Sequence, residues 1–118
     1  MSKTNQLQVD IASHSVQGLK DNNEDAVGFL VPEELPVLEG KGIVLAVADG
    51  VSSAEAGKEA SNTAIKRFLS DYYQTPDTWS VKHAGQKILS SINLTLFKRS
   101  HEFASEEKGY LTTFTALV

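Results

Sequence analysis

The sequence predicts an α+β fold in which two consecutive helices pack on antiparallel strands. Two stretches with apolar residues at helical spacing follow one another directly, as amphipathic helices do. Shorter apolar runs, either alternating or continuous, flank this pair and indicate strands. Helices that follow one another between strands favour an α+β fold with the helices on one sheet face. With 118 residues, the chain forms one domain at most.

The N-terminal part of the chain contains two expected strands. Apolar and polar residues alternate from Leu7, and this period of two is typical of a half-buried strand. A second apolar run is closed by Pro32. The elements expected up to this point are a flexible tail at residues 1–6, a strand from Leu7 to about His14 or Val16, a polar loop from Gly18 to Glu24 and a strand over Ala26–Val31.

The middle of the chain contains an expected loop and a third strand. Residues 32–42 include two prolines and two glycines, which predicts an exposed connection. Ile43–Ala48 is a continuous apolar run, as expected of a strand buried on both faces. It stops abruptly at Asp49-Gly50.

Two helices and a last strand complete the expected order, and each helix follows a serine that can cap it. Pro76 lies in the break between the helices. The second helix is expected to reach about Glu106, before Gly109, and alternation predicts a strand over residues 111–118. The first helix follows Ser52 or Ser53 with the apolar stripe Ala56, Ala60, Ala64, Ile65, Phe68, Leu69 and Tyr72, and the second follows Ser80 with Val81, Ala84, Ile88, Ile92 and Leu96.

The composition excludes several classes of function. No cysteine is present, so disulfides, thiolate zinc sites and cysteine nucleophiles are excluded, and a cytoplasmic location is expected. The net charge of −4, without any block of like charges, indicates no surface for nucleic acid or an anionic membrane. The N-terminus lacks the apolar stretch of a signal peptide, and no run is long enough to cross a bilayer.

Three carboxylates are expected at strand ends. Glu24 and Asp25 come directly before one strand, and Asp49 comes directly after another. Asp is a poor strand residue, so Asp49 must be solvated, capped or bound to a ligand, while Gly50 allows a sharp turn that exposes its carbonyl. If the two strands are neighbours, the carboxylates converge at one sheet edge and suit Mg²⁺ or Mn²⁺ rather than zinc. The alternative is structural, because Asp-Gly is a common turn dipeptide and Asn-Glu-Asp is compatible with a simple loop.

Three motifs include or follow these carboxylates. They are Gly18-Leu19-Lys20-Asp21-Asn22-Asn23-Glu24-Asp25-Ala26, Val47-Ala48-Asp49-Gly50-Val51 followed by Gly57, Ala60 and Ser61 on a helix, and Gly109-Tyr110-Leu111-Thr112-Thr113-Phe114. In order and spacing they resemble the motifs of the metal-dependent protein serine/threonine phosphatases of the 2C type. The first is similar to the Gly-x-x-Arg-x-x-Asn-Glu-Asp pattern of many bacterial members, and the third stands where the family has a Gly-Thr-Thr strand. The resemblance covers the chain from about residue 7 onward.

The resemblance implies a fold and an activity. The fold is a β-sandwich flanked by helices, an α-β-β-α sandwich, of which residues 7–118 are expected to form the N-terminal portion, incomplete at its C-terminus. The activity is hydrolysis of phosphoserine and phosphothreonine in proteins by a water that two Mg²⁺ or Mn²⁺ ions activate. Because the family supplies further aspartates from downstream strands, we expect a fragment with little or no activity alone. Its uncovered sheet surface favours self-association.

The resemblance also assigns roles to individual residues. Asp49 bridges the two metal ions, while Glu24 and the carbonyl of Gly50 bind one of them. Asp25 acts mainly through metal-bound water, so Asp25 and Asp49 are the catalytic residues that the resemblance implies. Lys20 stands where the family usually has a phosphate-binding Arg. A lysine supplies charge there but cannot form the two-pronged hydrogen bond of an arginine.

Two further departures from the family's pattern leave a second function open. Val51-Ser52-Ser53 replaces a glycine-rich stretch, and Leu111 replaces the glycine of Gly-Thr-Thr. Both changes affect positions where glycine normally allows close approach of the backbone. Together with Lys20 and the absent downstream aspartates, they favour the alternative of a non-catalytic, phosphatase-like binding or regulatory module.

Overall fold

The computed structural model describes residues 9–14, 24–51, 54–102 and 109–118. The elements of this part are, in chain order, β1 (Asp25–Leu30), α1 (Leu35–Lys41), β2 (Val44–Gly50), α2 (Ala54–Tyr72), α3 (Val81–Glu102) and β3 (Thr112–Leu117). The strands form a sheet in the order β1-β2-β3, in which both neighbouring pairs are antiparallel. The expected α+β class is therefore confirmed.

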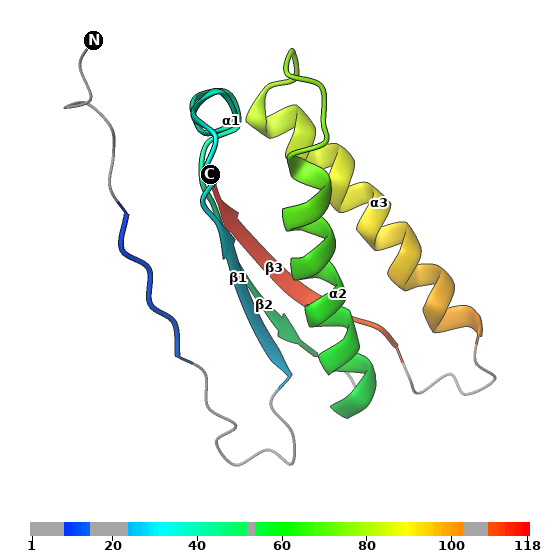
Figure 1. Cartoon of the computed structure of the whole chain (residues 1–118). Helices are drawn as coiled ribbons and strands as arrows, with labels where there is room; N and C mark the ends of the chain where they lie inside the picture. The colour runs from blue at the N-terminus through cyan, green and yellow to red at the C-terminus, as the bar shows by residue number, and fades with distance from the viewer. Residues whose placement is uncertain (1–8, 15–23, 52–53, 103–108) are drawn as a thin grey trace, which may run out of the picture.

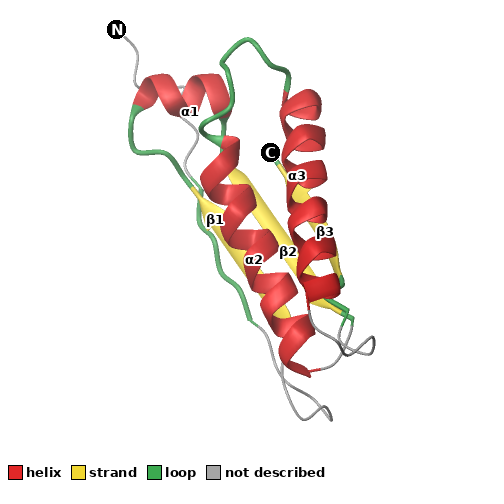
Figure 2. Ribbon diagram, turned by 90° about the vertical axis from the view of Figure 1, so that its right-hand side faces the viewer, coloured by secondary structure: helices red, strands yellow, loops and turns green. Residues whose placement is uncertain are grey.

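The two long helices lie on one face of this sheet (Figures 1 and 2). Helix α2 contacts all three strands, and α3 packs alongside α2. The expected arrangement of two helices on antiparallel strands is confirmed. The buried residues of the two apolar stripes are Ala56, Ala60, Ala64, Ile65, Phe68 and Tyr72 in α2 and Ala84, Ile88, Ile92 and Leu96 in α3.

The strands present small residues to α2, which brings the helix close to the sheet. Ala46 and Ala48 of β2 are buried beneath the helices. On β1, a Cβ added at Gly28 would lie 2.5 Å from the Cγ2 atom of Ile65 and 2.9 Å from the Cδ1 atom of Leu69. No real Cβ tolerates such contacts, so the side chains of α2 occupy the space that Gly28 leaves.

The opposite face of the sheet is exposed, and the prediction that Ile43–Ala48 is buried on both faces is wrong for this face. Val47 of the central strand is 57% exposed, and Phe29 and Leu117 on the flanking strands are 49% and 67% exposed. The described residues form a single sheet, so no second sheet covers these side chains. Residues 9–14 lie beside part of this face, with an open cavity of about 370 Å³ between them and β1 and β2.

Two other expectations about the N-terminal half are corrected. The described part of the first expected strand, residues 9–14, has no strand structure, because alternation alone does not provide a partner strand for hydrogen bonding. The expected connection at residues 32–42 contains helix α1. Pro36 lies in the first turn, where a missing N–H costs nothing, and Gly42 ends the helix at φ 82° with its N–H donated to the Leu38 carbonyl at 2.9 Å.

The prediction that the third strand stops before Asp49-Gly50 is wrong, because both residues belong to β2, whereas the other described strand boundaries lie within one residue of the expectations. The hydroxyl of Ser80 accepts the backbone N–H of His83 at 3.1 Å, so the expected cap of α3 is confirmed. The expected caps Ser52 and Ser53, and the expected end of α3 near Glu106, lie outside the described residues. Within the described part, no helix has both the length and the apolar character needed to cross a membrane.

Candidate functional site

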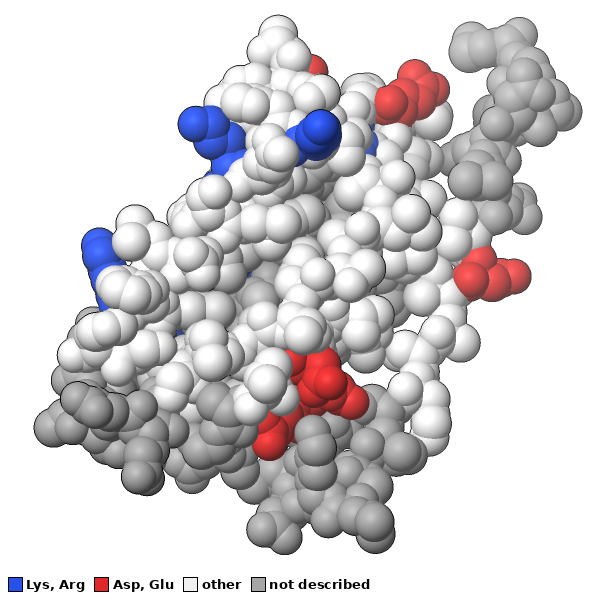
Figure 3. Space-filling model, turned by 180° about the vertical axis from the view of Figure 1, so that it is seen from behind, with Lys and Arg blue, Asp and Glu red and all other residues white. Residues whose placement is uncertain are grey.

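Four of the predicted site residues, Glu24, Asp25, Asp49 and Gly50, lie at the end of the sheet where β1 begins and β2 ends, but the three carboxylates do not converge on one face. The two strands are neighbours, as the metal hypothesis required, and Asp25 lies directly opposite Asp49 in the ladder. The backbone N–H of Gly50 donates to the carbonyl of Glu24 at 3.1 Å. Acidic side chains gather at this end of the molecule (Figure 3). Antiparallel pairing therefore brings together residues from two separate sequence motifs.

Asp25 and Asp49 lie on the exposed face of the sheet. Both residues are exposed, and both alternate with buried alanines, Ala26 and Ala48, that face the helices. Directly opposite residues in an antiparallel pair have Cβ atoms about 4.5–5.5 Å apart, and like charges at such positions destabilise the sheet. A cation bound between the two carboxylates would remove this repulsion.

Glu24 faces the helix-covered side of the sheet instead. Its side chain is only 9% exposed, and its Oε2 atom finds no hydrogen-bond partner in the part of the chain that the structure describes. A buried carboxylate oxygen without a partner is costly, because it has lost the hydrogen bonds that water would provide. This atom is therefore open to a cation or another donor.

Two glycines allow this packing. A Cβ at Gly57, in the first turns of α2, would collide with the carboxylate of Glu24. A Cβ at Gly50 would collide with the backbone of Gly57. The end of β2, the start of β1 and the N-terminal half of α2 thus meet at van der Waals distance, and the two glycines make this contact sterically possible.

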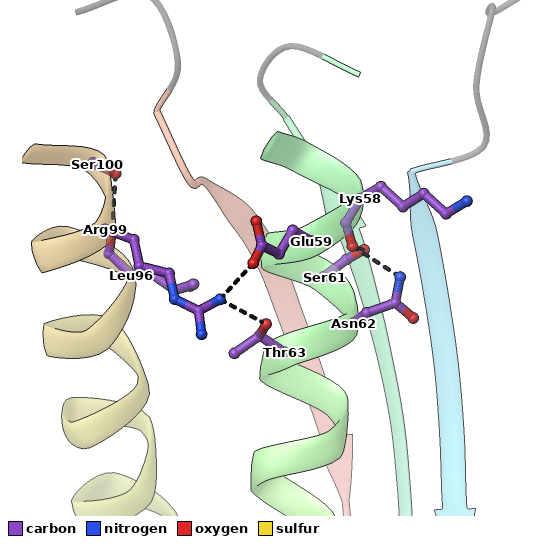
Figure 4. A network of polar contacts seen from close by, with 8 residues as sticks. All are labelled: Lys58, Glu59, Ser61, Asn62, Thr63, Leu96, Arg99 and Ser100. Atoms are coloured by element: carbon purple, nitrogen blue, oxygen red, sulfur yellow. Dashed lines mark hydrogen bonds and ion pairs between the residues drawn. The ribbon is translucent and has the colours of Figure 1, made fainter. Parts of the chain in front are cut away.

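Helix α3 holds the N-terminal half of α2 from the other side. Arg99 donates to the Oε1 atom of Glu59 at 2.8 Å and to the hydroxyl of Thr63 at 3.4 Å (Figure 4). Both partners are on α2, within two residues of the buried Ser61. The helix segment that packs on the site is therefore connected to α3 by polar contacts as well as by the core.

Thr113 contacts the site without having been assigned a role by the sequence. It lies opposite Asp49 on β3, and its hydroxyl accepts the backbone N–H of Asp49 at 3.2 Å. The same hydroxyl lies 3.4 Å from the Asp49 carbonyl. The sequence indicated only a strand residue here, because the register between β2 and β3 was not known.

Of the departures from the resembled motifs, the structure describes the surroundings of Leu111 but not those of Lys20. Leu111 is exposed, and its carbonyl accepts the backbone N–H of Val51 at 3.0 Å. A leucine side chain is therefore accommodated where the resembled motif has glycine. Lys20, the predicted phosphate-binding residue, lies outside the described residues.

The donor set consists of oxygen atoms only, which suits Mg²⁺ or Mn²⁺. Asp25 and Asp49 form an opposed pair, Gly50 follows directly, and Glu24 adds a buried, unpartnered oxygen from the other side of the sheet. Across residues 9–14, 24–51, 54–102 and 109–118, no group of three or more His, Cys, Asp or Glu residues has the arrangement of a metal site. The fit to a cation therefore rests on the opposed pair and on the unpartnered oxygen.

Comparison of the chain with models of protein families, with curated proteins and with solved structures gives no match.

Proposed function

We propose that this chain forms part of a metal-dependent protein phosphatase of the 2C type, which hydrolyses phosphoserine and phosphothreonine in proteins. The observation that carries the proposal is the opposed pair Asp25 and Asp49 at the same sheet end as Glu24, whose buried Oε2 atom, on the helix-covered side, has no hydrogen-bond partner among the described residues. This arrangement joins the first and second resembled motifs at one end of the sheet. A purely structural role for Asp49 in β2 would not explain the burial of a Glu24 oxygen that has no hydrogen-bond partner among the described residues.

Each site residue has a task in this proposal. Asp49, the Gly50 carbonyl and Glu24 hold Mg²⁺ or Mn²⁺, with two ions in the complete domain. When bound, the ions acidify a water molecule and neutralise charge on the phosphate ester. Asp25 would act by accepting a hydrogen bond from such a water. Lys20, a few residues before Glu24, provides a positive charge for the phosphate.

The backbone contacts support precise placement of these groups. The hydroxyl of Thr113 restrains the backbone N–H of Asp49, and the backbone N–H of Gly50 restrains the carbonyl of Glu24. Both acidic segments are therefore fixed to a hydrogen-bonded sheet rather than to a free loop. Groups held in this way lose little further conformational freedom when a ligand binds.

The test is Mn²⁺ binding by calorimetry together with Mn²⁺-dependent hydrolysis of p-nitrophenyl phosphate and a phosphothreonine peptide. We expect the 118-residue chain to bind Mn²⁺ with weak turnover or none, because the resemblance implies further aspartates from downstream strands. Asp49→Asn should abolish Mn²⁺ binding. Asp77→Asn, a change at an exposed aspartate in the turn between α2 and α3, should leave it intact.

Extension of the chain through the implied aspartates should restore Mn²⁺-dependent turnover. Equal Mn²⁺ affinity in the wild-type chain and in Asp49→Asn would refute the proposed site. Strong turnover by the 118-residue chain would show that further ligands are unnecessary, and would contradict the expectation of a fragment.

A second candidate is a non-catalytic phosphatase-like module that binds a partner or a phosphorylated segment. It is favoured by the division of the carboxylates between the two faces of the sheet and by the lysine at position 20. Binding of the phosphothreonine peptide without hydrolysis, both in this chain and in the extended one, would support this function over the enzyme.

A further inference from the structure

Ser61 forms a hydrogen bond that its position in a helix does not predict. The residue is 0% exposed, in the middle of α2, and its hydroxyl donates to the carbonyl of Glu24 at 2.6 Å. A serine inside a helix usually donates to a carbonyl of the preceding turn. That alternative acceptor, the Lys58 carbonyl, lies at 3.1 Å. The hydroxyl has one proton, and the shorter contact crosses from the helix to the sheet.

The Glu24 carbonyl is therefore an acceptor shared by two other elements. It accepts the Ser61 hydroxyl from α2 at 2.6 Å and the Gly50 N–H from the end of β2 at 3.1 Å. A carbonyl oxygen has two lone pairs, and both are used here. This three-residue junction of Glu24, Gly50 and Ser61 connects both acidic segments of the candidate site to the core helix.

The side chain of Glu24 is restrained by the same helix, one turn earlier. Its carboxylate occupies the space next to Gly57, where any side chain would collide with it. The backbone of Glu24 is thus fixed by Ser61 and its side chain is confined by Gly57. These two restraints keep the Oε2 atom in a buried position, where no described residue offers it a hydrogen bond. An unfavourable position of this kind persists only where the surrounding structure enforces it.

We propose that Ser61 is a positioning residue, which fixes the Glu24 carbonyl and thereby preorganises Glu24 and Gly50 to bind the metal ion. The inference rests on the proposed function for the identity of the ligand. The junction itself is a feature of the metal-free chain. Partners that orient a metal ligand without touching the metal typically change affinity by 10- to 100-fold when they are removed.

The first experiment measures the junction without any metal. Native-state hydrogen exchange by NMR on the metal-free chain reports the protection of the Gly50 amide, whose acceptor is the Glu24 carbonyl. Ser61→Ala should lower the protection of Gly50 by about tenfold more than that of amides in the middle of β2, the size expected for losing one buried hydrogen bond. Ala64→Gly, a change one turn along the same buried stripe, provides the control for a general loss of helix stability.

The second experiment measures Mn²⁺ affinity of the same variants by calorimetry. Ser61→Ala should bind Mn²⁺ about 10- to 100-fold more weakly than the wild type, and Ala64→Gly should bind within about threefold of it. Ser61→Cys, which keeps a side-chain donor, although a weaker and larger one, should lie between wild type and Ser61→Ala and serves if the alanine variant does not fold.

The outcomes separate this inference from the proposed function. If the exchange protection of the Gly50 amide is unchanged in Ser61→Ala, or falls equally in Ala64→Gly, the junction is overturned regardless of the measured Mn²⁺ affinity. Reduced Gly50 protection with unchanged Mn²⁺ affinity overturns the positioning role. A wild-type chain that binds no Mn²⁺ overturns the proposed function and the metal part of the inference, while the exchange data still decide whether Ser61 fixes Glu24.

Discussion

The ammonium group of Lys41 donates to both the carbonyl and the hydroxyl of Thr75, at 2.7 and 2.6 Å, although the two residues belong to distant parts of the chain. A third donor of the same ammonium reaches the Pro76 carbonyl at 3.2 Å. Lys41 ends α1, and Thr75 lies just after α2. The lysine therefore satisfies carbonyls of the turn that follows α2, near the C-terminal end of that helix, where a positive charge is favourable.

Lys41→Met should destabilise the chain by about 2 kcal/mol, because it keeps the apolar stem but removes the donor to the carbonyl and the hydroxyl of Thr75. The Pro76 carbonyl keeps the backbone N–H of Trp79 as a donor at 3.0 Å. Lys66→Met, at an exposed position of α2, should change the free energy of unfolding by less than about 0.5 kcal/mol. Urea unfolding followed by circular dichroism measures both. If the two variants had the same free energy of unfolding, the contacts of Lys41 would make no net contribution to stability.

Stability should fall at alkaline pH because of Tyr73. Burial, together with the neighbouring Tyr72, raises the pKa of Tyr73 from 10.0 to about 12. Its hydroxyl donates to the Gly42 carbonyl at 2.8 Å. Only the neutral phenol has the proton that this hydrogen bond requires. The Tyr73 phenol loses its proton near pH 10 in the unfolded chain and only near pH 12 in the folded chain. The contribution of Tyr73 to stability is therefore complete below pH 10 and is lost as the pH rises toward 12.

Urea midpoints measured from pH 8 to 12 test this expectation. Burial also raises the pKa of Tyr72, so Tyr73→Phe should make the alkaline loss of stability shallower without abolishing it. The phenylalanine variant should be less stable than wild type at pH 8, where the hydrogen bond is intact, and should approach it near pH 12. If the urea midpoints of wild type and Tyr73→Phe fell in parallel as the pH rises, the pKa of Tyr73 would be the same in the folded and the unfolded chain, which would contradict this prediction.

Gly28→Ala should destabilise the chain by about 1–3 kcal/mol, because the new methyl group would lie 2.5 Å from Ile65 and 2.9 Å from Leu69. Gly85→Ala is the matched control. Apart from its chain neighbours and the backbone of α3 itself, no described atom lies within 4 Å of the Cβ position at Gly85, and alanine there should stabilise the helix by about 0.5–1 kcal/mol. Opposite signs in thermal unfolding would confirm that α2 closely approaches β1. A neutral effect of Gly28→Ala would contradict it.

Self-association through the exposed sheet face stays a prediction of the chain's apolar surface. We expect a dimer or higher oligomer in sedimentation velocity at high protein concentration, driven by Val47 and its neighbours Phe29 and Leu117. Val47→Glu should shift the distribution to monomer. Leu94→Glu, at a position of α3 that is 54% exposed, should not. A wild-type monomer at every concentration, or equal effects of the two variants, would contradict this role of the sheet face.

The helices and most strand boundaries were predictable because burial on one face leaves a period in the sequence. The stripe from Ala56 to Tyr72 is an example, since every member of its four-residue repeat is buried. The sequence does not predict helix α1, because Pro36 and Gly42 are typical of loops, although each also suits one end of a short helix. The burial of Ile43–Ala48 was overestimated, because an apolar run does not reveal whether anything covers its second face.

The candidate site was predictable in its members but not in its geometry. The motifs identified Glu24, Asp25, Asp49 and Gly50, and the strand pairing brings them to one end of the sheet. That Glu24 and Asp25 face opposite sides follows from strand periodicity and could have been anticipated. The hydrogen bonds of Ser61 and Thr113 could not, because each joins residues whose alignment depends on the packing of α2 and on the register of β3.

The central position of β2 has a consequence for how the chain folds. Val47 pairs with Val27 on one side and with Thr115 on the other. The first partner is separated from β2 only by α1, whereas the second follows both long helices. During synthesis on the ribosome, β1 and β2 can therefore pair early, while the other edge of β2 waits for β3. Closing so long a connection is slow, and an unpaired edge attracts wrong partners in the meantime. The edge of β2 that pairs with β3 is therefore the part of the sheet that we expect to form last.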